Sequence, residues 1–404
     1  MGSIRARYSN SFFRWYLGYT ALETDLLFFI VYDAMFLTEV KGLSVAAVSW
    51  LTFLSLGFSL IIQYPLLKWI NRVGNKTAVI TGSVCFVLSS ACITFAPGFI
   101  VVLIGGFIKC IAHTLSAIGT AVLKRKLVSE YKEDMYVTYQ SDASGITSIV
   151  MMITSLLCGS LFEINAYLPM FACMGLSSAG VVCAVFITRG DTSSNEICIR
   201  NLEKKRRRAS MSSFGILLLI SFAMFTAITG TGLTYARLNF QTLLNDLEPG
   251  HIIWLLGLIS SLVYLFRFLS NILMSRTYST FKDRAAVLVS IMLTAGLILQ
   301  ILPWITGNTG KRAIMIAGYF MIAFARDPFI TLVQNISLKV DEVEAQQGSL
   351  VALNTAKKAG ALFLSAVGSL LTKWGIVYVM LLMLCISLAN IFVCNSAISR
   401  QQAK

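Results

Sequence analysis

The sequence predicts an all-α membrane protein with twelve transmembrane helices in two pseudo-symmetric six-helix bundles. Apolar residues make up 56% of the 404 positions and charged residues only 13%, whereas a soluble chain carries about 25% charge. The apolar residues gather in segments of about twenty, the length that a helix needs to cross a bilayer. Lys and Arg concentrate in alternate connections between these segments.

Each predicted span is an apolar segment long enough to cross the hydrocarbon layer as a helix, and more polar connections separate one segment from the next. In order along the chain, the predicted spans are 12–38, 44–67, 77–96, 99–123, 139–162, 166–188, 213–240, 251–275, 285–305, 313–336, 349–372 and 375–397.

The basic residues predict the orientation of these spans. One side of the membrane holds 22 of the 33, the other side four, and seven lie inside spans or at their margins. The positive-inside rule then places both termini in the cytoplasm of a multi-pass cell-membrane protein. The net charge of +14 is therefore a topology signal, and the expected environment is the lipid bilayer, with no nucleic-acid partner. The first segment is too long and too charged for a cleavable signal peptide.

A basic polar stretch, 189–212, divides the chain into an N-terminal bundle, 1–188, and a C-terminal bundle, 213–404. The halves resemble each other weakly. Residues 75–80 parallel 283–288 at an offset of 208, and 159–162 parallel 368–371 at an offset of 209. Parallel six-helix repeats are one plan of membrane transporters. We expect a monomer.

Charged side chains inside predicted spans are the main functional signal, because a charge at the bilayer centre costs about 2.5–3.5 kcal/mol. Such residues face an aqueous cavity or a partner, so they indicate a solute pathway. In the first span, helical spacing puts Tyr19, Glu23 and Asp33 on one face. Glu23 and Asp33 are proton-coupling candidates, and Tyr19 is a substrate-binding candidate. Asp25 falls on another face, where it can pair with a neighbouring helix. Alternatively, these acids only form ion pairs that hold helices together.

The fourth span presents Lys109 and His113 on one polar face. Lys109 is a substrate-binding candidate, or else it forms an ion pair with Glu23 or Asp33. His113 can join a proton relay, or it can be hydrogen-bonded between helices.

The C-terminal half supplies further substrate-binding candidates. They are Tyr264 and Arg267 in the eighth span, Tyr319 and Arg326 in the tenth, and Lys357 in the eleventh. A buried arginine requires a carboxylate, a phosphate or an anionic ligand. Asp327 can neutralise an arginine of this half, Pro328 can open the tenth helix locally, and Lys357 can instead reach the lipid headgroups.

Soluble catalysis finds no support in the sequence. There is no phosphate-binding glycine loop and no His-Glu-x-x-His motif, and the nine cysteines form no Cys-x-x-Cys pair. We therefore expect no catalytic residues, no metal site and no cofactor. The Gly230–Gly232 run indicates a weak point in the seventh helix rather than a nucleotide site.

The connection after the second span carries Leu67-Lys68-Trp69-Ile70-Asn71-Arg72-Val73-Gly74-Asn75-Lys76. With the six-plus-six spans and the basic central loop, this element resembles the major facilitator superfamily, whose signature there is Gly-x-x-x-Asp-Arg/Lys-x-Gly-Arg/Lys-Arg/Lys. Arg72, Gly74 and Lys76 match, whereas Asn71 replaces the aspartate that supports gating in the family. The resemblance implies a gating loop at these residues, and alternating access around a central site without ATP hydrolysis. It also makes Lys109 the counterpart of a basic residue of the family's fourth helix.

The function favoured by these observations is proton-coupled secondary transport of a small organic solute, anionic or zwitterionic, with that solute and protons as partners. One alternative is a proton/drug antiporter. The fifth span, however, contains Gly145 and Gly159 but no proline, whereas efflux members carry a Gly-Pro-rich motif there. Another alternative is a membrane receptor of the same fold that does not transport.

Overall fold

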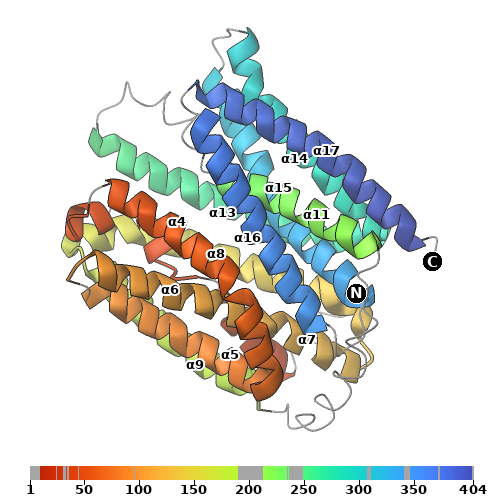
Figure 1. Cartoon of the computed structure of the whole chain (residues 1–404), viewed down its shortest axis with the longest axis horizontal. Helices are drawn as coiled ribbons and strands as arrows, with labels where there is room; N and C mark the ends of the chain where they lie inside the picture. The colour runs from red at the N-terminus through yellow and green to blue at the C-terminus, as the bar shows by residue number, and fades with distance from the viewer. Residues whose placement is uncertain are drawn as a thin grey trace. The chain divides into compact units, whose positions relative to one another are not determined.

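The computed structural model describes residues 10–23, 25–30, 33, 36–43, 45–95, 97–189, 213–233, 235, 249–306, 311–340, 346–371 and 374–402. Every regular element within these residues is helical, and the chain forms two compact units, Met1–Arg207 and Arg208–Lys404. Figure 1 colours the helices of unit 1 from red to yellow-green and those of unit 2 from green to blue. Residues 190–212 of the predicted linker lie outside the described residues.

The helices of unit 1 are α2 (Ser11–Leu22), η1 (Phe36–Val40), α4 (Val45–Ile61), α5 (Gln63–Phe95), α6 (Phe99–Ser116), α7 (Ile118–Ser129), η2 (Glu133–Met135), α8 (Tyr136–Ile164) and α9 (Leu168–Ile187). The helices of unit 2 are α11 (Ser213–Ala227), η3 (Ile228–Gly232), α13 (Pro249–Phe281), η4 (Lys282–Arg284), α14 (Ala285–Thr306), α15 (Lys311–Val340), α16 (Gln346–Leu371) and α17 (Ile376–Gln402).

Nine helical stretches of the described residues are long and apolar enough to cross a membrane. One of them, Ser261–Ile305, contains most of the predicted eighth span and all of the ninth. The first two predicted spans are not among the nine, because α2 and α4 have only 12 and 17 residues. The second span instead combines α4 with the first turns of α5.

The continuous helix predicted for 12–38 is wrong. Helix α2 ends at Leu22, and residues 25–28 form turns and bends. The predicted face of Tyr19, Glu23 and Asp33 depended on unbroken helical spacing, so it does not exist in the structure. The seventh span carries the predicted weak point, where the π-helix η3 interrupts the α-helical pattern. The tenth helix, in contrast, continues through Pro328.

The two units repeat the same helix packing. In unit 1, α2 packs on α8 and α9, α5 packs on α6 and α9, and α4 packs on α6. The corresponding pairs of unit 2 are α11 with α16 and α17, α14 with α15 and α17, and α13 with α15. Each unit therefore builds its interior from the same five contacts, and the weak sequence repeat corresponds to a structural one.

Candidate functional site

The break in the first span places Asp25 in a polar cluster with helix α6. Asp25 Oδ1 lies 2.8 Å from Lys109 Nζ and 3.3 Å from His113 Nε2. The same oxygen accepts a hydrogen bond of 2.7 Å from the Leu26 N–H. Lys109 and His113 reach one atom because residues four apart lie on the same face of a helix. The side chains of Asp25, Lys109 and His113 are 14%, 22% and 30% exposed.

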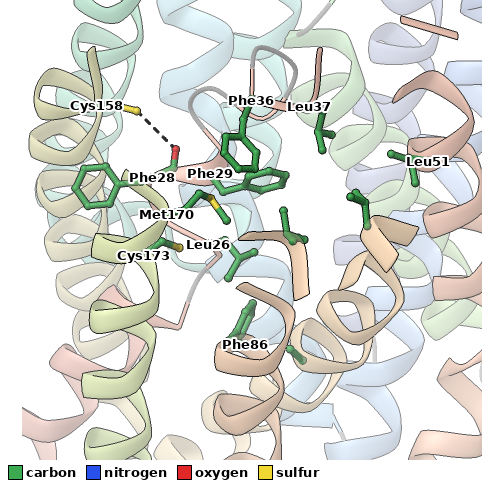
Figure 2. Close-up of a cluster of buried hydrophobic side chains, with 13 residues drawn as sticks. Leu26, Phe28, Phe29, Phe36, Leu37, Leu51, Phe86, Cys158, Met170 and Cys173 are labelled. Atoms are coloured by element: carbon green, nitrogen blue, oxygen red, sulfur yellow. Dashed lines mark hydrogen bonds between the residues drawn. The ribbon is translucent and has the colours of Figure 1, made fainter. Parts of the chain in front are cut away.

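Aromatic side chains pack against this cluster. The Lys109 ammonium lies 5.4 Å from the centroid of the Phe29 ring, and the His113 ring meets Phe86 edge-on at 5.0 Å. Figure 2 shows Leu26, Phe28 and Phe29 of the broken segment together with Phe86, Met170 and Cys173. The Cys158 thiol is 3.9 Å from the Phe28 carbonyl oxygen, to which it donates a weak hydrogen bond. Contacts with other helices thus hold the non-helical segment in place.

The partner of Lys109 differs from the prediction, which offered Glu23 or Asp33. The ion pair is made with Asp25, the acid that was expected to pair with a neighbouring helix. Asp33 is exposed and interacts with Lys109 electrostatically. Lys109 is therefore partly neutralised by acids of its own unit.

Glu23 occupies a separate and much more buried position. Its side chain is 3% exposed, and its backbone N–H donates to the Tyr19 carbonyl at 2.9 Å, which closes the last turn of α2. The carboxyl group packs directly against Gly180 of α9, where a methyl group would overlap it. Ser83 of α5 borders the carboxyl, although its hydroxyl donates to the Val79 carbonyl at 3.3 Å. Neither Glu23 carboxyl oxygen meets hydrogen-bond geometry with any described residue.

Tyr19 is also buried, at 2% exposure. Its hydroxyl donates to the Ser116 carbonyl at 3.2 Å. This carbonyl lies at the junction where α6 ends and α7 begins, so it lacks part of the regular helical pairing. Tyr19 consequently links the end of α2 to a second helix break, in the fourth span.

In unit 2, Arg267 of α13 forms a two-pronged ion pair with Asp327 of α15. Arg267 Nε donates to Asp327 Oδ2 and Nη2 donates to Oδ1, both at 2.8 Å. Asn271 donates to Asp327 Oδ2 at 3.4 Å and to the Arg267 carbonyl at 2.9 Å. The guanidinium also lies 5.1 Å from the centroid of the Tyr264 ring. Asp327 thus neutralises Arg267, as one of the two sequence interpretations proposed.

The remaining candidates of unit 2 are partly buried. Arg326 interacts electrostatically with Asp327. The Tyr319 ring centroid lies 6.2 Å from that of Phe320. Lys357 lies on α16 and is also partly buried.

The predicted gating loop is a sharp turn between two helical stretches of α5. Gly74 has φ 81° and ψ 169°, a conformation that essentially only glycine adopts. Asn71, Arg72 and Lys76 flank the turn and are exposed.

The expected pairing of Asp25 with a neighbouring helix is confirmed by its ion pair with Lys109. Sequence reasoning missed Gly180, because its role depends on which residues α9 meets. Unit 2 also contains a buried chain in which Ser221 donates to Asn390 Oδ1 at 2.7 Å and Asn390 donates to Ser290 at 3.2 Å. Isolated serines and one asparagine in apolar spans did not predict this network.

Two units with the same helix packing, long apolar helical stretches and charged groups held within these stretches define a multi-pass membrane protein. No protein-family description and no curated protein sequence matches the chain. Solved structures do match it. A crystal structure of a bacterial homologue of the iron transporter ferroportin in an outward-facing state has a TM-score of 0.76 at 14% identity. The match covers 96% of this chain and 99% of that chain.

Two further structures match over similar lengths. One is a bacterial ferroportin homologue in an outward-facing state with soaked iron, with a TM-score of 0.74, 13% identity, and coverage of 96% of this chain and 98% of that chain. The other is the human organic anion transporter MFSD10 (TETRAN), with a TM-score of 0.67, 15% identity, and coverage of 94% and 98%. The chain therefore has the fold of these transporter structures, as the resemblance to the major facilitator superfamily implies.

Proposed function

We propose that the protein is a secondary active transporter that moves a small organic solute by alternating access and is driven by protons. The observation that carries the proposal is Glu23, a carboxyl group buried at a helix break with no hydrogen-bond partner among the described residues. Together with the transporter fold, it provides a proton-binding group inside a membrane-spanning unit. Asp33 and His113 remain further candidates for the proton pathway.

The argument for proton binding rests on the cost of a buried charge. An unpaired carboxylate in an apolar surrounding is penalised by several kcal/mol, whereas a protonated carboxyl group is penalised far less. The position against Gly180 therefore suits the protonated form of Glu23. Loss of the proton favours a rearrangement that lets water or a cation reach the carboxylate. A conformational change and a proton release are linked in this way.

The solute class is proposed from the basic side chains. Lys109, Arg267, Arg326 and Lys357 lie on membrane-spanning helices, and each can donate charge-assisted hydrogen bonds to an anionic group. MFSD10, one of the structures of similar fold, is named as an organic anion transporter. Both facts support an anionic or zwitterionic solute. Asp25 and Asp327 already pair with Lys109 and Arg267. An anionic solute that binds Lys109 or Arg267 is therefore expected to displace the carboxylate of Asp25 or Asp327 from that basic side chain.

The similarity to ferroportin homologues raises the question of a metal ion as the solute. Within the part of the chain that the structure describes, no three His, Cys, Asp or Glu residues are grouped so that they could hold a metal ion. No observation on these residues therefore favours a metal over an organic solute.

The proposal is tested in proteoliposomes. Uptake of labelled organic anions, zwitterions and cationic drugs is measured with and without a pH gradient, after a thermal-shift screen has selected the solutes that stabilise the purified protein. We expect an anion or zwitterion to accumulate only with the gradient. If cationic drugs alone are moved, the protein is a proton/drug antiporter, and if no solute is moved, the receptor alternative holds.

Replacing Glu23 with Gln should abolish accumulation driven by the pH gradient, while solute exchange across equal pH continues. Glutamine keeps the shape of a protonated carboxyl group but carries no exchangeable charge, so it separates coupling from binding. Unchanged accumulation in the Glu23→Gln variant would contradict a role for Glu23 in coupling.

A further inference from the structure

A stripe of exposed side chains at the second span changes from apolar to basic along the helix. Ile61 and Tyr64 are 76% and 55% exposed. They are followed at helical spacing by Lys68 and Arg72, and then by Lys76 beyond the Gly74 turn, all three exposed. The Lys68 ammonium lies 4.6 Å from the centroid of the Tyr64 ring.

The same stripe recurs in unit 2 at the offset of 208 residues that relates the sequence repeats. Leu269 and Ile272 correspond to Ile61 and Tyr64, and they are 42% and 47% exposed. Arg276 and Arg284 correspond to Lys68 and Lys76, and both are exposed. Two positions of exposed apolar residues and two of exposed basic residues are thus repeated in register.

This arrangement matches the cross-section of a lipid leaflet. Exposed apolar side chains at the end of a membrane-spanning helix suit the acyl chains, and the aromatic ring of Tyr64 suits the headgroup level. Basic side chains one to three turns further along then reach the depth of the lipid phosphates. Each basic residue near an anionic surface contributes to attraction of acidic headgroups.

We propose that each unit carries a binding site for the headgroup of an anionic phospholipid. The first site, called the N-patch, consists of Tyr64, Lys68, Arg72 and Lys76. The second, called the C-patch, consists of Ile272, Arg276 and Arg284. Continuity of the basic residues with exposed apolar surface identifies the ligand as a lipid rather than a free phosphate, because only a lipid occupies both parts of the stripe.

The two patches differ in charge. The residue between Gly74 and Lys76 is Asn75, whereas its counterpart between Lys282 and Arg284 is Asp283. An acidic side chain beside Arg284 repels a phosphate, and the N-patch also has Arg72 where unit 2 has Thr280. The N-patch is therefore the stronger site. It lies at the predicted gating loop, so an anionic lipid bound there would influence the movements of that loop.

The test uses full-length purified protein in detergent, with retained lipids counted and affinities measured by native mass spectrometry. Phosphatidylglycerol and phosphatidylcholine of the same acyl chains are titrated separately. The variant Lys68→Gln/Arg72→Gln/Lys76→Gln should lose at least about tenfold in phosphatidylglycerol affinity while phosphatidylcholine binding is unchanged. The matched control is Lys132→Gln, since Lys132 is an exposed basic residue already paired with Glu130 at 2.9 Å.

Removal of exposed charges leaves the interior intact, so the triple variant should unfold at the temperature of the wild type when lipid is absent. If it does not, Lys68→Gln/Arg72→Gln is used with the same readout. Wild-type phosphatidylglycerol affinity in both variants would overturn the proposal. So would glycerol phosphate competing as well as the lipid, because the patch would then bind a free phosphate. The lipid measurement requires no transport, so its result is independent of the proposed function.

Discussion

At the scale of single residues, the structure divides the charged side chains of the spans into paired and unpaired groups. Asp25 with Lys109 and Asp327 with Arg267 are close ion pairs. Glu23 has no such partner among the described residues. An ion pair in a low-dielectric environment is tolerated because each charge solvates the other. A lone carboxyl group is tolerated when it is neutral, which supports the proposal that Glu23 binds the proton.

Gly180 should determine whether Glu23 can occupy its buried position. A methyl group at residue 180 would overlap the carboxyl group, so Gly180→Ala should impair accumulation driven by a pH gradient and shift its pH profile. Gly175→Ala is the matched control on the same helix, because a methyl group there meets open space. Among the described residues, Tyr19 of α2 and Cys183 of α9 are the titratable groups that interact with Glu23, and both remain in the two variants.

A second measurement distinguishes a role of Gly180 in positioning Glu23 from a general loss of folding caused by the substitution. If Gly180 acts through Glu23, adding Gly180→Ala to Glu23→Gln should change the remaining solute exchange little, since coupling is already lost. Equal pH profiles for Gly180→Ala and Gly175→Ala would show that the contact has no part in coupling.

The Arg267–Asp327 pair gives a stability prediction. Asp327→Asn leaves the guanidinium buried without its carboxylate, and the expected loss of unfolding free energy is about 3–5 kcal/mol. Arg267→Met/Asp327→Leu removes both charges and should recover most of this loss. Thermal unfolding in detergent measures both variants. A double variant as unstable as Asp327→Asn would mean that lost packing, and not the unpaired charge, accounts for most of the loss of unfolding free energy.

The same pair tests solute binding. If Arg267 also contacts an anionic solute, the charge-free double variant should fold but bind that solute at least about tenfold more weakly, equivalent to about 1.4 kcal/mol. Normal solute binding by the folded double variant would assign Arg267 a structural role only.

At the scale of elements, the helix breaks show what the sequence can and cannot predict. The seventh span was predicted to be weak at Gly230–Gly232, and the π-helix η3 lies there. The first span breaks at Glu23 and the fourth at Ala117, yet neither break lies at a proline or glycine. These breaks are favoured by tertiary contacts, such as the Asp25 ion pair and the Tyr19 hydrogen bond. Helical spacing therefore gave the wrong face for Glu23 and Asp33.

The Gly74 turn is an element whose sequence requirement is testable. Gly74→Ala should destabilise the protein by about 1–3 kcal/mol, because alanine is strained at φ 81° and ψ 169°. Gly57→Ala is the control, since residue 57 lies inside α4 and a methyl group there meets open space. Thermal unfolding in detergent distinguishes the two. A stable Gly74→Ala variant would mean that the turn can adopt another conformation.

The corresponding turn of unit 2 is built differently. Lys282, the counterpart of Gly74 at an offset of 208 residues, has φ 48°. The repeat has therefore kept a left-handed residue at this connection while changing the residue type. The offset also relates Gln63 and Asn271, whose side-chain amides donate to the carbonyls of Ser59 and Arg267, four residues earlier.

At the scale of the whole molecule, the fold was far more predictable than the site. A bilayer forces backbone polar groups into helices, so apolar segments of about twenty residues largely determine an all-α membrane architecture. The candidate site depends on which helices meet, and composition does not encode this. Gln63 illustrates the difference, because it bonds to Thr114 in unit 1 whereas its counterpart Asn271 bonds to Asp327 in unit 2. The same position in the repeat thus supports a neutral contact in one unit and an ionic cluster in the other.

The predicted orientation of the whole chain, with both termini cytoplasmic, rests on the 22 basic residues that the predicted spans put on one side and the four on the other. In a cysteine-free background, single cysteines replace Tyr131, which is 97% exposed on the predicted cytoplasmic side, and Trp374, which is 76% exposed on the opposite side. An impermeant thiol reagent applied to intact cells should label position 374 and spare position 131. After the cells are permeabilised, both positions should be labelled, which controls for the reactivity of each cysteine. Labelling of position 131 alone in intact cells would reverse the orientation and place both termini outside.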